Sequence, residues 1–212
     1  MELGEIILQF VKENYYIDKN KKNFFVIRLI DILISLVGLI IGLPIIIIFS
    51  MFIIMETKDN PIYSQMRVGL ENKEFKMYKL RSMVANAEKN GAKWAEKNDP
   101  RITKVGRIIR KTRIDEIPQL FNVLKGDMSI IGPRPEREIF YKEFEKKIPN
   151  FRERLLIKPG LTGYAQVNGG YDIKPIEKLN LDLYYIRNKS LKLDLIIIIK
   201  TFKILVTGEG AR

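Results

Sequence analysis

One stretch of the chain is apolar over a length that matches the thickness of a membrane. It runs from Phe24 to Met55, and from Ile32 to Met55 no charged side chain occurs in 24 consecutive residues. About 20 apolar residues in a helix cross the hydrocarbon core of a bilayer. A secretory signal has a shorter apolar region with a small-residue cleavage site. A buried helix of a soluble protein is rarely this long and uniformly apolar. The pattern therefore predicts a membrane helix.

Pro44 interrupts this helix, and we expect a kink there because proline removes a backbone donor and clashes with the preceding turn. The part from Pro44 to Met55 would be about 18 Å long, too short to span alone. Lys and Arg are frequent on both flanks, whereas a single span should show an asymmetry between its two sides. We expect a re-entrant helix with both ends cytoplasmic, with a plain span as the alternative. Arg28 and Asp31, three residues apart, are expected to pair with each other.

Shorter patterns fill the rest of the chain. Apolar positions recur at helical spacing in residues 101–112 and again between Ile117 and Leu124, and they alternate around residues 75–80. The predicted elements are a polar helix over 1–23, two strands around a turn at 69–72, a polar helix over 84–98 in which Trp94 packs or anchors at the interface, and helices over 101–112, Ile114–Lys125 (ended by Gly126), 136–148 and Ile176–Asn188.

The tail from Leu191 to Val206 is apolar, but four charged residues interrupt it. These charges argue against a second span. They favour an amphipathic helix that lies in the membrane interface or docks on the first membrane segment. The predicted fold is α+β, predominantly α-helical with a small β-hairpin, in a monotopic membrane protein with a kinked re-entrant helix and interfacial amphipathic helices. We divide it into residues 1–55 and an integrated cytoplasmic, membrane-associated domain over 56–212.

Composition narrows the chemistry. The 37 Lys and Arg against 25 Asp and Glu give a formal net charge of +12 and a pI of about 9.7, so a polyanionic partner is expected. The chain has no Cys and no His. A disulfide framework, a Cys-based zinc site and a Ser-His-Asp triad are thereby excluded. Any reaction has to rely on carboxylates, Lys, Arg, Tyr, Ser and Thr.

The residues that best fit such a reaction lie in 110–136, RKTRIDEIPQLFNVLKGDMSIIGPRPE. Asp115 and Glu116 are adjacent in an otherwise basic and apolar background, which suggests a divalent metal and a phosphorylated substrate. Arg134, fixed between two prolines, suits a bidentate contact with phosphate. The candidate cations are Lys79, Arg81, Arg110, Arg113 and Arg134.

Each of these features has a simpler alternative. Two acids at a helix start compensate the helix dipole. Lys79 and Arg81 are compatible with ordinary solvated charge, and Arg134 with an exposed turn. The loop Lys158–Gly163 could bring backbone N–H groups to an anion, although a short glycine loop of this kind is common.

Several motifs together resemble the bacterial sugar transferases, the monotopic polyprenol-phosphate phosphoglycosyl transferases. They are the membrane helix, PIYSQMRVG, FKMYKLRSM, TRIDEIPQLFNVLKGDMSIIGPRP and KPGLTGYAQVNG, in the family's order over roughly residues 24–205. One departure is Leu43, where many relatives have Ser before the proline.

The resemblance implies transfer of a sugar-1-phosphate from a UDP-sugar to a polyprenyl phosphate such as undecaprenyl phosphate, with release of UMP. It implies that Asp115 is the nucleophile, forming a covalent phosphosugar intermediate, and that Glu116 holds Mg²⁺. Lys79, Arg110 and Arg134 match positions that serve the phosphates, with Arg81 and Arg113 as weaker matches. It further implies a location at the cytoplasmic face of the bacterial inner membrane, where this enzyme starts surface glycan assembly.

Other functions are open at this stage. A membrane-anchored basic scaffold that binds anionic lipid is the main alternative, and a glycosyltransferase releasing UDP is another. No recognition helix, zinc finger or aromatic RNA-binding motif occurs, so nucleic acid is not an expected partner. The expected partners are a UDP-sugar, a polyprenyl phosphate and membrane lipid, and a homodimer is compatible with the sequence.

Overall fold

A computed structural model describes residues 21–89, 91, 99–169 and 173–207. Most of the predicted helix over 1–23, and Trp94, lie outside these residues. The described elements are α2 (Lys21–Thr57), β1 (Ile62–Val68), β2 (Glu74–Leu80), α3 (Lys104–Lys111), α4 (Gln119–Lys125), β3 (Ser129–Ile131), α5 (Glu138–Glu145), β4 (Gly160–Thr162), α6 (Tyr164–Gly169), α7 (Pro175–Arg187) and α8 (Leu191–Thr207), with 3-10 turns at Leu70–Asn72, Ile114–Glu116 and Phe151–Leu156.

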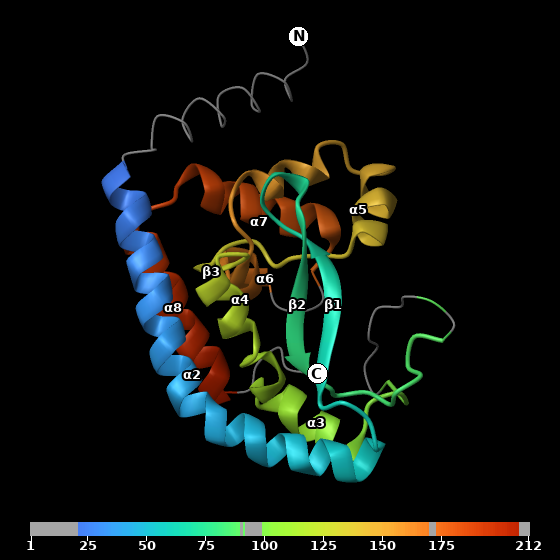
Figure 1. Cartoon of the computed structure of the whole chain (residues 1–212). Helices are drawn as coiled ribbons and strands as arrows, with labels where there is room; N and C mark the ends of the chain where they lie inside the picture. The colour runs from blue at the N-terminus through green and yellow to red at the C-terminus, as the bar shows by residue number, and fades with distance from the viewer. Residues whose placement is uncertain (1–20, 90, 92–98, 170–172, 208–212) are drawn as a thin grey trace.

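Helix α2 is the longest element and contains Pro44. Figure 1 shows that it bends, running past α8 and α4 and then turning beneath α3. Within the described residues it is the one helix long and apolar enough to cross a membrane, and only 11% of its most apolar stretch is buried. The predicted kink is confirmed, and the membrane topology stays a prediction.

Arg28 and Asp31 do not form the predicted pair. The Arg28 guanidinium donates to the carbonyl oxygens of Val123 at 2.6 Å and Leu124 at 2.5 Å. The Asp31 carboxylate accepts from the Ser129 hydroxyl at 3.0 Å and the Ile130 N–H at 2.9 Å. Each side chain thus has its hydrogen-bond partners on another element, Arg28 at the end of α4 and Asp31 at β3, so the two do not turn toward each other on α2.

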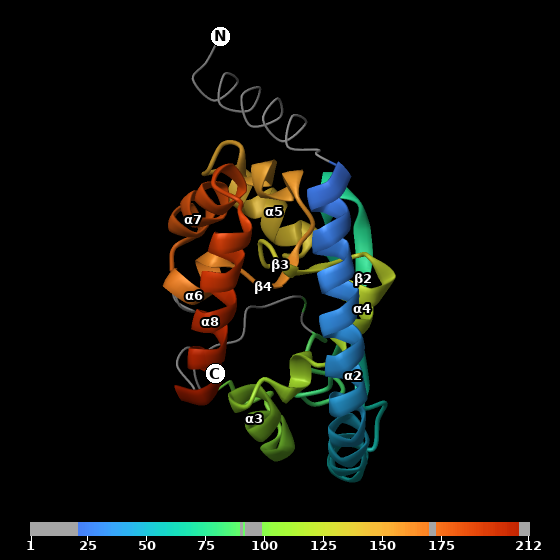
Figure 2. The same ribbon diagram turned by 90° about the vertical axis from the view of Figure 1, so that its left-hand side faces the viewer.

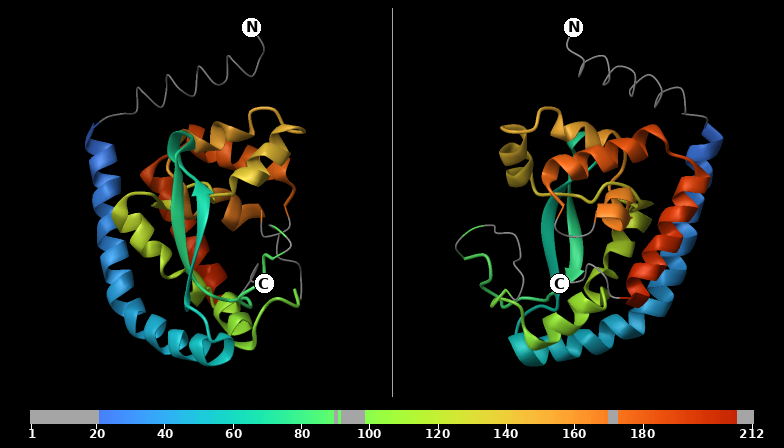
Figure 3. Two further views of the ribbon diagram at one scale, coloured as in Figure 1. Left: turned by 45° about the vertical axis from the view of Figure 1, so that its right-hand side comes forward. Right: turned by 180° about the vertical axis from the view of Figure 1, so that it is seen from behind.

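The predicted hairpin is confirmed. Strands β1 and β2 pair antiparallel, from Ile62 opposite Leu80 to Val68 opposite Glu74. The hairpin runs between α5 at one end of the molecule and α3 at the other (Figure 3).

The sequence did not predict a second sheet, in which β3 and β4 pair in parallel. The loop over 158–163 is therefore part of a sheet. The Gly160 N–H donates to the Pro133 carbonyl at 3.0 Å. The prediction that the loop's N–H groups could approach an anion is therefore wrong for the Gly160 N–H. A Cβ on Gly160 would lie 2.0 Å from the Gly132 nitrogen, and the close pairing requires glycine there.

Two predicted helices differ in extent. Residues 85–89, the described start of the polar helix over 84–98, form turns. The helix predicted over 101–112 begins at Lys104, because Ile102 bridges to Met83 and Thr103 caps the helix by accepting from the Gly106 N–H at 2.9 Å.

The helix predicted over Ile114–Lys125 is divided into a 3-10 turn and α4, with Pro118 at the junction. Its end is as predicted: Gly126 has φ +94° and closes α4 in the left-handed conformation.

The C-terminal helix α8 confirms the element predicted over Leu191–Val206. One of its residues, Ile197, is fully buried in the main core, and α8 contacts α6 and β4. Seven of its apolar side chains are exposed: Leu191, Leu195, Ile196, Ile199, Phe202, Leu205 and Val206. Figure 2 shows α8 and α2 as separate columns, so α8 is not docked along α2.

Candidate active site

The carboxylate pair lies in the 3-10 turn that precedes α4. Asp115 is 6% exposed, and the Glu116 side chain is 12% exposed. Arg113, just before the turn, has φ +55°, and this left-handed residue redirects the chain from α3 into the turn. No side chain caps α4. Capping of α4 by the two acids, one part of the simpler alternative, is therefore not observed.

Two cations from distant parts of the chain meet the pair. The Lys79 Nζ, on β2, lies 3.4 Å from the Glu116 Oε1 and 4.0 Å from the Asp115 Oδ2. The Arg134 Nη2, on the loop after β3, lies 2.5 Å from the same Glu116 oxygen. The fold thus assembles both carboxylates with Lys79 and Arg134 in one partly buried cluster.

The surroundings give the two acids different acidities. Burial raises the pKa of Asp115 to about 6; Lys79 opposes this effect and Glu116 adds to it. Burial acts on Glu116 too, but Arg134 and Lys79 outweigh it and hold the pKa of Glu116 far below its usual range. Neighbouring carboxylates with separated pKa values are typical of catalytic sites.

The other predicted cations divide into two groups. Arg110, near the end of α3, has a buried Nη1 with no hydrogen-bond partner in the described residues, and its charge lowers the pKa of Asp115. Arg113 similarly lowers the pKa of Glu116. Arg81 instead donates to the Asn60 carbonyl at 2.7 Å and pairs with Asp59 at 3.4 Å, which ties the end of β2 to the segment after α2.

Sequence reasoning missed a buried charge network beneath the Arg134 loop. Glu136 pairs with Arg67 at 3.4 Å and with Lys178. Arg154 pairs with Asp182 at 2.6 Å, and these two side chains are only 0% and 2% exposed.

This network holds the backbone on either side of the Arg134 side chain. The Arg154 Nη2 donates to the Arg134 carbonyl and the Arg67 Nη1 donates to the Pro135 carbonyl, both at 3.1 Å. Along the sequence these residues resemble ordinary surface charges. Arg154 is preceded by the charged residues Arg152 and Glu153 and followed by Leu155, so no signal in the sequence indicated that it is buried or paired.

The pair can accept a divalent cation only with help from a substrate. In the described part of the chain no group of three or more His, Cys, Asp or Glu is placed to hold a metal. Mg²⁺ usually takes one or two carboxylates and completes its shell with water and substrate phosphates. Asp115 and Glu116, ionised side by side among phosphate-attracting cations, fit that pattern.

Comparison with known proteins gives a consistent result. The family model described as "Bacterial sugar transferase" matches residues 22–208. A Bacillus subtilis protein described as a putative undecaprenyl-phosphate N-acetylgalactosaminyl 1-phosphate transferase is 56% identical over 138 residues, covering 65% of this chain and 77% of its own.

Two longer relatives match nearly the whole chain. The UDP-N-acetylgalactosamine-undecaprenyl-phosphate N-acetylgalactosaminephosphotransferase of Aeromonas hydrophila is 44% identical over 191 residues, 89% of this chain. The undecaprenyl-phosphate galactose phosphotransferase of Salmonella typhimurium is 38% identical over 222 aligned residues, 98% of this chain. This chain spans 45% of the length of each. The match over residues 22–208 shows that the chain belongs to the bacterial sugar transferase family.

Proposed function

We propose that this protein transfers a sugar-1-phosphate from a UDP-sugar to polyprenyl phosphate and releases UMP. Membership of the family and the names of the relatives support this activity. The observation that carries this proposal is the carboxylate pair of Asp115 and Glu116, whose pKa values are shifted in opposite directions. The cations around the pair are Lys79, Arg134 and Arg110.

Asp115 is the nucleophile of the first step. Its carboxylate oxygen attacks the β-phosphorus of the UDP-sugar, and the bond from that phosphorus to the bridging oxygen breaks. The electron pair leaves with UMP, and the sugar phosphate stays on Asp115 as an acyl phosphate. A carboxylate needs no general base for this attack, which suits a chain without His.

The second step restores the enzyme. A phosphate oxygen of the polyprenyl phosphate attacks the phosphorus of the acyl phosphate, and the bond to Asp115 breaks. The products are a polyprenyl diphosphosugar and the free carboxylate. Because the lipid acceptor is held in the bilayer, the site has to lie near the membrane surface, and we propose that α2 is re-entrant and keeps the catalytic residues at the cytoplasmic face.

The cations serve the phosphates. Lys79 and Arg134, which contact Glu116, and Arg110, with an unpartnered buried nitrogen in the described structure, are available to the oxygens of the pyrophosphate. Glu116 would hold Mg²⁺, which when bound neutralises charge on the transferring phosphoryl group. Glu116 is fully ionised at neutral pH because its pKa is so low, and is ready for this role.

The test is intact mass after protein is mixed with Mg²⁺ and UDP-N-acetylgalactosamine, UDP-galactose or UDP-glucose, the sugars named for relatives. We expect one added sugar phosphate without acceptor, and its loss when polyprenyl phosphate is added. Asp115→Asn should form no adduct. Asp127→Asn, which changes an acid paired with Lys125 at the end of α4, is the matched control.

UMP release that requires the lipid acceptor and gives no adduct would indicate direct transfer and exclude the covalent step. UDP as product would identify a glycosyltransferase instead. The absence of both the adduct and UMP with all three donors would contradict the proposed activity.

A further inference from the structure

The two halves of α2 contact different parts of the catalytic domain. Before Pro44, Leu39 packs against the main core, which includes Leu120 of α4. After Pro44, Ile53 is fully buried in a separate cluster with Leu80 of β2 and Ile109 of α3. The bend of α2, visible in Figure 1, therefore lies between two packing surfaces.

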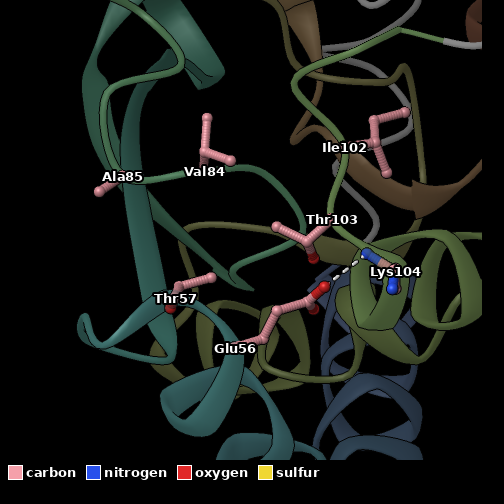
Figure 4. A pocket seen from close by; sticks show the side chains of 7 residues that line it. All are labelled: Glu56, Thr57, Val84, Ala85, Ile102, Thr103 and Lys104. Carbon is pink, nitrogen blue, oxygen red and sulfur yellow. Dashed lines mark hydrogen bonds between the residues drawn. The ribbon is translucent and has the colours of Figure 1, made fainter.

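The second half of α2 also holds the start of α3. The Glu56 carboxylate accepts from the Lys104 N–H at 2.8 Å and from the Val105 N–H at 3.0 Å. Figure 4 shows Glu56 reaching from α2 to this helix end. A carboxylate on the free N–H groups of a helix start is favourable. Helix α3 carries Arg110 at its other end, so Glu56 fixes the helix that bears this cation.

The carboxylate pair is flanked by two isoleucines that belong to different clusters. Ile114 packs against the cluster of Ile53, on the far side of the bend, whereas Ile117 packs against the main core. The backbone of the catalytic turn is thus held from both halves of α2 within four residues. A change in the bend would rotate this turn.

Gly42 of α2 lies close to Ile117. A Cβ on Gly42 would lie 2.6 Å from the Ile117 Cγ2. This methyl group is attached directly to the Cβ of a β-branched residue with restricted χ1, so it cannot move far without its backbone. Gly38 has a similar approach, 2.7 Å to the Leu120 Cδ1, but there the contact is the end of a flexible side chain.

We propose that the bent helix α2 is a positioning element for the reaction, with Gly42 and Glu56 as positioning residues. Gly42 determines how closely the turn that bears Asp115 and Glu116 approaches α2. Glu56 determines the position of α3 and its Arg110. This rests on the proposed function, because the geometry matters through the transfer step.

The experiment compares Gly42→Ala with Gly38→Ala, the same change one turn earlier on the same helix. The rate of UMP release and the KM for the donor are measured with whichever of the three UDP-sugars the wild-type protein uses best. We expect Gly42→Ala to lower kcat at least tenfold with KM within threefold. Gly38→Ala should stay within threefold in both, because Leu120 can rotate away.

A second substitution that restores kcat would distinguish a positioning role of Gly42 from a general loss of folding. Ile117→Leu removes the Cγ2 methyl, so Gly42→Ala/Ile117→Leu should recover most of the lost kcat. Equal rates for Gly42→Ala and Gly38→Ala in a preparation whose wild type is active would overturn the positioning proposal alone, as would a double variant with no recovery. A wild-type protein that releases no UMP would overturn the proposed function and this proposal with it.

A second pair of variants applies even where Gly42→Ala does not fold. Glu56→Ala removes the cap of α3 and should lower kcat/KM at least tenfold. Glu71→Ala, an exposed acid paired with Lys73 in the hairpin loop, should leave it unchanged. A Glu56→Ala protein that is folded and fully active would contradict the role of Glu56.

Discussion

At the scale of single residues, the site depends on the burial of Asp115. A buried carboxylate is costly when ionised, and its pKa of about 6 reflects that cost. The proposed first step, however, needs the ionised form as nucleophile. The residue to which we assign the first step is therefore one that the fold would be more stable without.

The first prediction concerns this conflict. We expect Asp115→Asn to be more stable than wild type at pH 8, by on the order of 3 kcal/mol, since the pKa of Asp115 is raised from 3.8 to about 6 and one pKa unit is about 1.4 kcal/mol. Asp115 has a folded-state pKa above its unfolded value of 3.8, so its own stabilisation is present at low pH and is lost as pH rises through about 6. The advantage of Asn should accordingly shrink as pH falls from 7 toward 4. Thermal unfolding in detergent across this range is the measurement, and equal stability at pH 8 would contradict it.

The second prediction is a pH profile. Only ionised Asp115 can attack, so the single-turnover rate of adduct formation should fall as pH drops below about 6, approaching tenfold per unit. Glu116 stays ionised throughout that range because its pKa is far lower. Rapid quenching followed by intact mass measures the rate. A rate that stays constant down to pH 4.5 would rule out this titration.

The third prediction concerns Arg154, which is fully buried with Asp182. Arg154→Met leaves Asp182 without its partner and should cost about 3–5 kcal/mol. Arg152→Met, two residues away, removes surface pairs with Glu138 and Glu145 and should cost about 1 kcal/mol or less. Denaturant unfolding of both variants tests the contrast. Recovery of stability in Arg154→Met/Asp182→Leu would support the assignment to an unpaired charge, and similar losses for Arg152 and Arg154 would contradict it.

At the scale of elements, α2 and α4 are joined by polar contacts as well as packing. Arg28 closes the last turn of α4, whose first turn follows the carboxylate pair. The Val123 carbonyl also accepts from the Gly126 N–H at 3.0 Å, and the charged Arg28 donor adds a second hydrogen bond at this helix end. The predicted Arg28–Asp31 pair was wrong because each side chain found a partner outside its own helix.

The fourth prediction follows from this contact. Arg28→Met should lower the free energy of unfolding by about 1.5–3 kcal/mol, the range for hydrogen bonds to charged groups. Arg107→Met, which replaces an exposed arginine of α3, serves as the control and should change it by less than about 0.5 kcal/mol. Thermal unfolding in detergent compares them. An Arg28 variant as stable as the Arg107 variant would show that the α4 carbonyls find water instead.

At the scale of the whole molecule, most of the exposed large apolar side chains in the described residues lie on two helices. Helix α2 exposes apolar side chains along most of its length, and α8 adds seven more. Exposed apolar surfaces of this extent mark an interaction with a membrane or a partner. Together with the +12 charge, which favours anionic lipid headgroups, they support attachment to a membrane surface.

The fifth prediction is the topology. The chain has no Cys, so Glu2→Cys and Asn60→Cys can be labelled without altering any native thiol. With a membrane-impermeant reagent and intact cells, neither should react, and both should react after permeabilisation. Labelling of either site from outside would contradict a re-entrant helix and favour a plain span.

The sequence by itself determined most of the local elements and indicated which groups are candidates for the reaction. An uncharged stretch of 24 residues, a proline within it, alternation in the hairpin and a glycine after α4 are signals that act over neighbouring residues, and each produced its element. The motifs that resemble the family identified Asp115 and Glu116 in the same way. Where the local signal was weak, as for the polar residues 84–98, the prediction of a helix was wrong for the described part.

Only the tertiary structure decided which residues meet. Lys79 and Arg134 reach Glu116 from separate elements, Arg81 turns to Asp59, and Arg154 with Asp182 supports the Arg134 loop. The parallel pairing of β3 and β4, far apart in the chain, was equally absent from the sequence pattern. The physical reason is that burial, ion pairing and pKa depend on three-dimensional distance, whereas hydrophobic periodicity and turn chemistry depend on neighbours along the chain.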